Sequence, residues 1–501
     1  MQEEKPAANG KDSLKQKTPV QIDLEYLSDR IEPIGPTFGY QDDPYVVQNG
    51  EKTTVVFASN HDEGRSNLWK IVFEPFERPK TEMIQGAATG SGFIRQAKAQ
   101  CYALINGNIA TLNLDGNKAE PISIDFTFRR DLSAEFSQMF FETWANLEQN
   151  FYDEKFHGKD WPALRDRYAA FLPHLNTRSD LRLLLNDLLG ELNSSHLGFN
   201  SNGPEEEIFY KTRSAATGVL FAYRVERIVS KSPAGLSNKD IKPGDRLVKV
   251  NGVAVDPALN REKYVVQPSL DDEIALTFKR GTEEKTVKLH PVSTGAVSQL
   301  LYDEWEADCQ KKVDTQSKDR IAYFHMKDMG LGELNRFLRD MVSDGWQKQG
   351  LILDLRYNTG GNVHNEVLQF LSQKPYLNWK YREGGLSPQP NFGPAAKPIV
   401  LLVNEPSLSD AEMTAQGFKQ LKLGTIVGTE TYRWIIFTSG KGLVDGSFYR
   451  LPSWGCYTLD GKDLEVTGVT PDIYIKNTFM DRLEGKDPQL DKAIQLILQQ
   501  L

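Results

Sequence analysis

The stretch PIVLLVNEPSLSDAEMTAQGFKQL (residues 398–421) contains a continuous apolar run, a short polar turn and then apolar residues at helical spacing. An apolar run of this length is typical of a buried strand, and the turn before Asp410 is typical of a helix start. The same order surrounds this stretch, with strands expected at 320–326, 350–356 and 424–429 and helices at 330–346 and 363–373. Such alternation predicts parallel βαβ units with right-handed crossovers.

The rest of the chain reads as several further domains. Its 501 residues are too many for one core and suggest about three or four domains. Residues 133–192 have apolar positions at helical spacing, with Thr177 as a helix cap. We expect a multidomain α+β protein, divided into a disordered linker (1–19), a β-rich segment like propeller blades (20–130), a helical catalytic subdomain (131–205), a PDZ-like domain (206–295), an αβ, crotonase-like βαβ catalytic subdomain (296–480) and a C-terminal helix (481–501).

Two of these assignments depend on turn signals. Between residues 20 and 130, short strand-like runs are separated by turns such as NHDEG and LDGN. A blade or two cannot close a propeller, which takes about four to eight, so this segment should leave open strand edges. Residues 212–292 have a strand-helix-strand order in which Asn251-Gly252 predicts a hairpin turn, as in a PDZ domain.

Composition excludes some classes of function. Apolar residues make up 39% and charged residues 25%, and 59 basic against 68 acidic side chains give a net charge of −9. No basic field attracts nucleic acid or an anionic membrane, and no apolar run is long enough to span a bilayer. The three cysteines form no metal-type pair, so we expect no metal and no cofactor. The first residues lack a secretory signal, so the expected location is cytoplasmic.

Ser409 is the first candidate for chemistry. It lies between a buried strand and a helix start, where its hydroxyl would stand above the strand end beside free backbone N–H groups. The alternative is structural, because Ser409 and Glu412 also fit the S-x-x-E capping box. The local sequence alone favours the capping role.

A second strand-to-helix turn carries paired glycines. Gly360 and Gly361 follow the strand LILDL and allow a backbone N–H to approach a ligand without a Cβ in the way. With the N–H of Asp410, this turn could form an oxyanion hole. The alternative is that the glycines only permit a tight turn.

Two histidines compete for the role of a general base. His196 closes the helical region, where a histidine gains from the helix dipole whether or not it reacts. His364 begins the helix after the glycine pair, beside the proposed site. The local sequence does not choose between them.

The order of several motifs resembles the catalytic half of the tricorn proteases, which are related to the C-terminal-processing peptidases. The motifs are NFYDEKFHGKDWPALRDRYAAFLP, TRSDLRLLLNDLLGELNSSH, DLRYNTGG, NEPSLSDAE and DLEVTGVTPD, and the resemblance covers about residues 20–500. It implies a serine peptidase site with Ser409 as nucleophile, His196 as base, Ser195 and Glu465 orienting the histidine, and the N–H groups of Gly361 and Asp410 as the oxyanion hole.

The chain also departs from its relatives. C-terminal-processing peptidases use a lysine base after the nucleophile's helix, whereas this chain has Trp434 there and no lysine. Where the tricorn protease has an acidic residue selecting basic side chains, the aligned position is Trp379. We expect Trp379, with Gly360, to line a substrate pocket that favours hydrophobic or aromatic residues.

The sequence therefore predicts a serine endopeptidase. Its expected substrates are peptides or unfolded proteins, and the resemblance implies a homo-oligomer. The alternative is a scaffold in which the PDZ-like domain binds a peptide's C-terminal end through the amides of 218–221, while the peptidase site is idle.

Overall fold

The computed structural model describes residues 25, 31–89, 93–98, 100–125, 127, 129–201, 203, 205–206, 212–237, 239–391 and 393–501. The segment 1–19, predicted to be a linker, lies outside the described residues. The chain forms two compact units, Met1–Arg129 and Arg130–Leu501. Each unit is described by itself.

The first unit contains one eight-stranded sheet in the order β1-β2-β3-β4-β8-β7-β6-β5. Each half is an antiparallel meander of four strands, and a short parallel pairing of β4 with β8 joins the halves. The predicted strands are present, while their identity as propeller blades stays a prediction. The strands are β1 (Gln41–Asn49), β2 (Lys52–Ser59), β3 (Asn67–Phe73), β4 (Lys80–Ala88), β5 (Phe93–Ala97), β6 (Gln100–Ile105), β7 (Asn108–Asn113) and β8 (Lys118–Pro121).

The second unit begins with the helices α1 (Leu132–Asn150), α2 (Trp161–Ala169) and α3 (Arg178–Gly190). Thr177 caps α3 as predicted, through a capping box with Asp180. The buried leucines of α3 pack with Phe136, Phe140 and Trp144 of α1. These helices therefore share one apolar core.

A hairpin from the C-terminal part of the chain completes this helical core. Strand β25 (Phe437–Gly442) pairs with β26 (Phe448–Trp454), and β26 pairs with β9 (Gly198–Asn200), which follows α3. Tyr449 and Leu451 of β26 are buried among the helices, and the buried Arg178 of α3 forms an ion pair with Asp445 in the hairpin turn. The residues just before β9 are thereby held beside the C-terminal part of the chain.

Residues 213–293 form small antiparallel sheets around their own core. Val250 and Val253 pair across Asn251-Gly252, and both turn residues have positive φ, so the predicted hairpin turn is confirmed. The PDZ identity of this region stays a prediction. The elements are β10 (Arg213–Ala216), β11 (Val219–Phe221), β12 (Val225–Ile228), α4 (Pro233–Leu236), β13 (Arg246–Val250), β14 (Val253–Ala254), β15 (Val266–Gln267), β16 (Ile274–Arg280), β17 (Glu283–Leu289) and β18 (Val292–Ser293).

The αβ part is built on a parallel five-stranded sheet in the order β19-β20-β23-β24-β27. The predicted alternation of strands and helices is confirmed. The strands are β19 (Ile321–His325), β20 (Gly350–Asp354), β23 (Ile399–Val403), β24 (Thr425–Gly428) and β27 (Ile473–Tyr474). The helices are α5 (Thr294–Ser317), α6 (Leu331–Ser343), α7 (His364–Leu371), α8 (Asp410–Gln420), α9 (Leu464–Thr467), α10 (Phe479–Leu483) and α11 (Pro488–Leu498).

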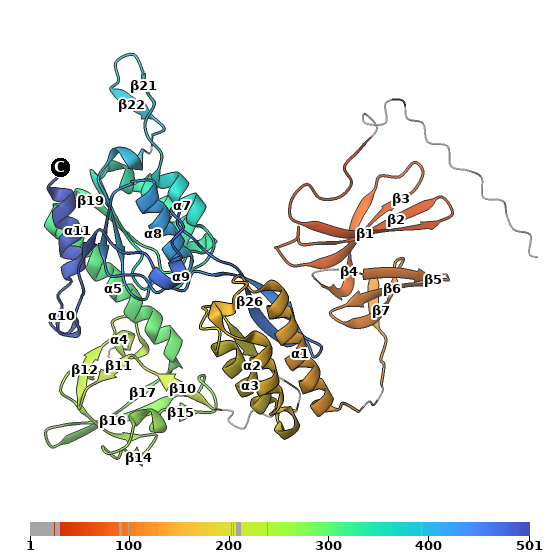
Figure 1. Ribbon diagram of the computed structural model, residues 1–501, viewed down its shortest axis with the longest axis horizontal. Coiled ribbons are helices and arrows are strands. Elements are labelled where there is room, and N and C mark those ends of the chain that lie inside the picture. Colours follow the sequence, from red (N-terminus) through yellow and green to blue (C-terminus); the bar gives the residue numbers. More distant parts are fainter. Residues whose placement is uncertain are drawn as a thin grey trace, which may run out of the picture. The chain divides into compact units, whose positions relative to one another are not determined.

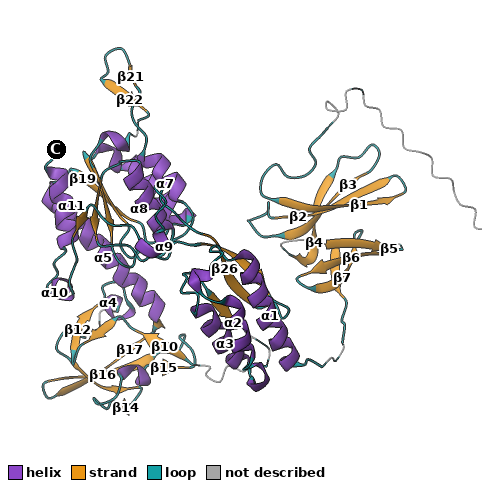
Figure 2. Cartoon of the chain, in the orientation of Figure 1, coloured by secondary structure: helices purple, strands orange, loops and turns teal. Residues whose placement is uncertain are grey.

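Helices cover both faces of this sheet (Figures 1 and 2). Alternate residues of each strand point to opposite faces: Leu401 of β23 packs with α6, α7 and α8, whereas Val400 and Leu402 pack with α5 and α11. Because both faces are buried, the strands read as continuous apolar runs. The carboxyl ends of β20 and β23 lead directly into the two turns that the sequence singled out.

Candidate active site

Ser409 occupies a strained backbone position between β23 and α8. Its φ of 57° and ψ of −117° lie in a region that glycine adopts easily and other residues rarely adopt. The turn before it is fixed by Ser407, whose hydroxyl donates to Leu355 O at 2.8 Å and accepts from Asn404 N at 3.0 Å. Strain of this kind persists where the surroundings enforce it, and it is common at catalytic sites.

Glu412 helps to enforce that position. Its buried carboxylate accepts hydrogen bonds from the N–H of Ser409 at 3.1 Å and the N–H of Trp434 at 2.8 Å. It also accepts from Arg433 N and from Thr431 Oγ1. Burial raises the pKa of the Glu412 carboxyl, and the four donors oppose this rise. The capping box considered from the sequence is thus part of a network that ties Ser409 to the 431–434 loop.

The glycine turn lies against Ser409. Gly360 has φ of 78°, and a Cβ added to it would stand 2.7 Å from the Ser409 Cβ. A Cβ on Gly361 would stand 2.1 Å from the carbonyl oxygen of Met329. No side chain fits at either position without a shift of the backbone, so the two glycines are required by close packing as well as by turn geometry.

Within the described residues, two backbone N–H groups near Ser409 have no hydrogen-bond partner. Asp410 is the first residue of α8, and such residues lack an intrahelical acceptor for the N–H. Within the described part of the chain, neither Gly361 N nor Asp410 N donates a hydrogen bond, although Asn362 N donates to Met329 O at 2.8 Å. Unpartnered backbone donors next to a candidate nucleophile are the components of an oxyanion hole.

His196 is oriented by Ser195 and Glu465. The Ser195 hydroxyl donates to Glu465 Oε2 at 2.9 Å and lies 3.2 Å from His196 Nδ1. Glu465 also accepts from the N–H of Ser195 at 2.5 Å. Since the single hydroxyl hydrogen is given to Glu465, Ser195 accepts from Nδ1–H, which leaves the lone pair on His196 Nε2.

The imidazole of His196 is neutral near pH 7. Burial chiefly, and the nearby Arg450 guanidinium secondarily, lower the pKa of His196 to about 4. The ordinary pKa of histidine is about 6.5, so the ring is uncharged at pH 7 and can accept a proton. Its backbone φ of 59° is also positive, as at Ser409.

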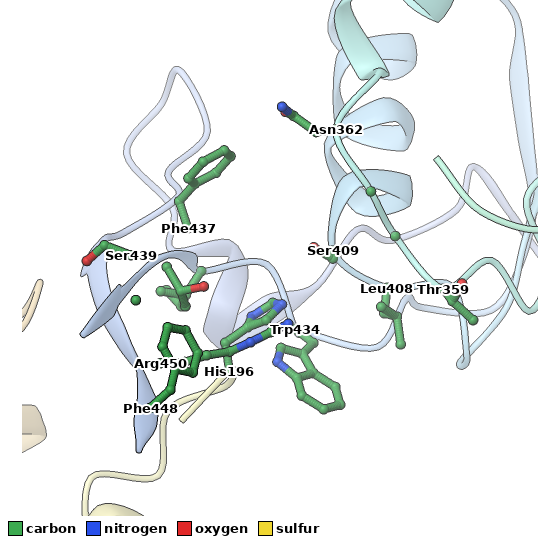
Figure 3. Close-up of a pocket in the computed structure, with 15 residues that line it drawn as sticks. His196, Thr359, Asn362, Leu408, Ser409, Trp434, Phe437, Ser439, Phe448 and Arg450 are labelled. Atoms are coloured by element: carbon green, nitrogen blue, oxygen red, sulfur yellow. The ribbon is translucent and has the colours of Figure 1, made fainter. Parts of the chain in front are cut away.

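Ser409 and His196 line one cavity of about 770 Å³. Figure 3 shows Ser409 and Leu408 on one side, and His196, Arg450 and Phe448 on the other. Trp434 packs edge-to-face against the His196 ring with centroids 5.2 Å apart. Among the hydrogen bonds of the described residues, none joins His196 to Ser409. Catalytic hydrogen bonds of this kind often tighten only when substrate is bound.

The rival histidine has other partners. His364 Nδ1 lies 2.5 Å from Asp410 Oδ1, and this hydrogen bond raises the pKa of His364. The other oxygen of Asp410 accepts from the N–H groups of Val363 and His364. The pair fastens the glycine turn to α8, and His364 is not among the residues that line the cavity.

Trp379 is not among the described residues that line this cavity, and its place in a substrate pocket stays a prediction. It lies on the hairpin of β21 (Leu377–Lys380) and β22 (Leu386–Gln389), which extends from the αβ part (Figure 1), and it is 63% exposed. Gly360 does line the cavity. The apolar wall comes instead from Trp434, Ile436, Phe437 and Phe448. The sequence singled out Trp434 only as the residue at the place of a lysine base, whereas Phe437 of β25 and Phe448 of β26 carry no local signal of this role.

Comparison with known proteins finds two family models that match parts of this chain. Residues 132–190 match the tricorn protease C1 domain, and residues 320–475 match peptidase family S41. The chain is a relative of the tricorn proteases. It is 30% identical over 388 residues to tricorn protease homolog 1 of Streptomyces coelicolor, covering 73% of this chain and 35% of that protein. It is 27% identical over 470 residues to the tricorn protease of Thermoplasma volcanium, covering 88% and 44%.

The fold agrees with this relationship. The crystal structure of the tricorn protease matches with a TM-score of 0.72 at 23% identity, over 91% of this chain and 46% of that one. The predicted resemblance to the tricorn proteases is confirmed, and the chain spans less than half the length of these relatives. In the described residues no helix has the length and apolar character needed to cross a membrane, and no three His, Cys, Asp or Glu side chains are grouped as metal ligands.

Proposed function

We propose that this chain is a serine endopeptidase with Ser409 as nucleophile and His196 as general base. One observation supports the proposal most: distant parts of the chain meet at a single cavity. Ser409 comes from the αβ part at a strained φ, and His196 follows the helical part with its Nε2 lone pair free. A capping serine and a structural histidine have no need to share a cavity with Gly361, whose N–H donates no hydrogen bond within the described residues.

The proposed reaction proceeds through an acyl-enzyme. Ser409 Oγ attacks the carbonyl carbon of the scissile peptide, and its proton passes to His196 Nε2. The N–H groups of Gly361 and Asp410 stabilise the oxyanion, while Ser195 and Glu465 stabilise the imidazolium. The C–N bond then breaks, and the amine leaves with the proton from His196. Water repeats the sequence on the acyl-enzyme to release the acid.

A peptide-binding role for the PDZ-like region is a second candidate. Strand β11 pairs on one side only, with β12, so its other edge is open within the described residues. An extended peptide can add to such an edge through its main chain. This activity would be compatible with peptidase function. Peptide binding would be the function of the chain in place of proteolysis only if the site at Ser409 were inactive.

The remaining parts of the proposal rest on the family resemblance. We propose that the substrates are peptides or unfolded proteins, that the chain assembles into a homo-oligomer and that it acts in the cytoplasm. Since the chain spans less than half the length of the two curated tricorn relatives described above, each needs its own measurement.

Labelling with a fluorophosphonate tests the proposed function. We expect the probe to label wild-type protein on Ser409 and to leave Ser409→Ala unlabelled, because phosphonylation needs an activated serine hydroxyl. Ser343→Ala, an exposed serine at the end of α6, is the matched control and should label as wild type. In-gel fluorescence measures the signal. Equal labelling of Ser409→Ala, or no labelling of correctly folded wild type, would reject the peptidase site.

A further inference from the structure

The cavity that contains Ser409 carries a single charged side chain. Among its described lining residues there is one arginine, Arg450, and no aspartate or glutamate. The guanidinium group keeps its proton at any pH relevant to the protein. The wall around it is mostly apolar and includes Phe437 and Phe448. Arg450 is therefore the charged side chain at the described cavity wall, while the carboxylates of Glu412 and Glu465 lie behind the wall and accept from backbone and hydroxyl donors.

Strand pairing leaves the Arg450 side chain uncovered. In β26, Arg450 pairs with Gly440 of β25 on one side and with Gly198 of β9 on the other. Residues directly opposite in antiparallel strands place their side chains next to each other. Both neighbours are glycines, so no cross-strand side chain screens the guanidinium. Phe448, two residues earlier, lines the cavity on the same face of the strand.

Arg450 also lacks a partner within the described residues. No ion pair or hydrogen bond of its guanidinium is present there, and it is exposed to the cavity. By contrast, Arg178 of α3 forms ion pairs with Glu135, Glu205 and Asp445. Five donors in a fixed fork, in the same cavity as the proposed nucleophile, suit a planar carboxylate.

We propose that Arg450 binds a carboxylate of the peptide substrate and so selects peptides that carry a negative charge close to the cleaved bond. This inference rests on the proposed peptidase function. The carboxylate can come from a Glu or Asp side chain or from the peptide's C-terminus, because the two groups have the same chemistry. Phe437 and Phe448 would pack against apolar parts of the same peptide.

A role in tuning His196 is the competing explanation. The Arg450 charge helps to lower the pKa of His196, so its loss would alter hydrolysis of every peptide alike. Substrate selection has a different signature, because it changes the ratio between a charged peptide and its neutral counterpart. The experiment therefore measures ratios of kcat/KM.

The test uses pairs of internally quenched peptides of one sequence. In the first series, the two peptides of a pair carry Glu or Gln at one position near the cleaved bond, and each such position is tested in turn. In the second, the two peptides end in a free C-terminal carboxylate or in an amide. We expect wild type to prefer the charged member of at least one pair by about ten-fold or more. Arg450→Gln should abolish that preference, and Arg450→Glu should transfer it to a Lys peptide. Arg339→Gln, which removes an exposed charge on α6, should keep the wild-type ratio.

The outcomes separate this inference from the proposed function. A preference in the Glu/Gln pair assigns the site to acidic side chains, and one in the carboxylate/amide pair assigns it to C-termini. Equal ratios in wild type and Arg450→Gln, with Ser409 still labelled by the fluorophosphonate, would overturn the role of Arg450 and leave the peptidase intact. Without Ser409 labelling, the proposed function itself fails.

Discussion

Replacing His196 by alanine is expected to lower kcat/KM for peptide hydrolysis by about 10³- to 10⁶-fold. The reason is that Ser409 is a weak nucleophile unless a neighbouring base takes its proton. His196 is the described histidine that lines the Ser409 cavity, and its lowered pKa keeps it unprotonated at pH 7. Steady-state hydrolysis of a quenched peptide measures the loss, and circular dichroism checks that the variant is folded.

His364→Ala is the matched control. His364 forms a hydrogen bond with Asp410 and is not among the residues that line the cavity. Its replacement should therefore lower kcat/KM only modestly, because the glycine turn would be held less firmly. If His364→Ala were inactive and His196→Ala retained most activity, the assignment of the base would be wrong.

Replacing Glu465 by alanine is expected to lower kcat/KM by about 10²- to 10⁴-fold, by analogy with the orienting carboxylate of a catalytic triad. Glu465 accepts from both the hydroxyl and the N–H of Ser195 and from Ile435 N. Without it, Ser195 is free to donate to His196 Nδ1, which would move the ring hydrogen to Nε2 and remove the basic lone pair from the cavity. The change should appear in kcat.

A second acidic residue serves as the control for this experiment. Glu148→Ala removes an exposed carboxylate from α1 and should leave kcat unchanged. Fluorophosphonate labelling of Ser409 should slow in Glu465→Ala by a similar factor to hydrolysis. Wild-type kcat in Glu465→Ala would show that the Ser195 network is structural.

The sequence predicted the αβ part well because its signals are local. The apolar runs at 350–354 and 399–403 are strands buried on both faces, and the turns after them are set by glycine and by the helix start at Asp410. Asn251-Gly252 likewise determines its own turn. In such places a few adjacent residues dictate the backbone.

The composition of the cavity wall was not predictable in this way. Phe437, Phe448 and Arg450 reach the cavity because β26 pairs with β9 across more than two hundred residues of sequence. Nothing local in the hairpin indicates that register. Trp379 was expected at the pocket from an aligned position, and it lies on a hairpin that extends from the αβ part. Long-range pairing, which single-sequence patterns do not encode, decides which residues line the site.

A crystal structure of the fluorophosphonate-treated protein would show the proposed site directly. We expect phosphorus bonded to Ser409 Oγ, one phosphonyl oxygen accepting from the N–H groups of Gly361 and Asp410, and His196 Nε2 within hydrogen-bond reach of the adduct. An adduct on another serine, or His196 turned away while His364 contacts the phosphonate, would contradict it.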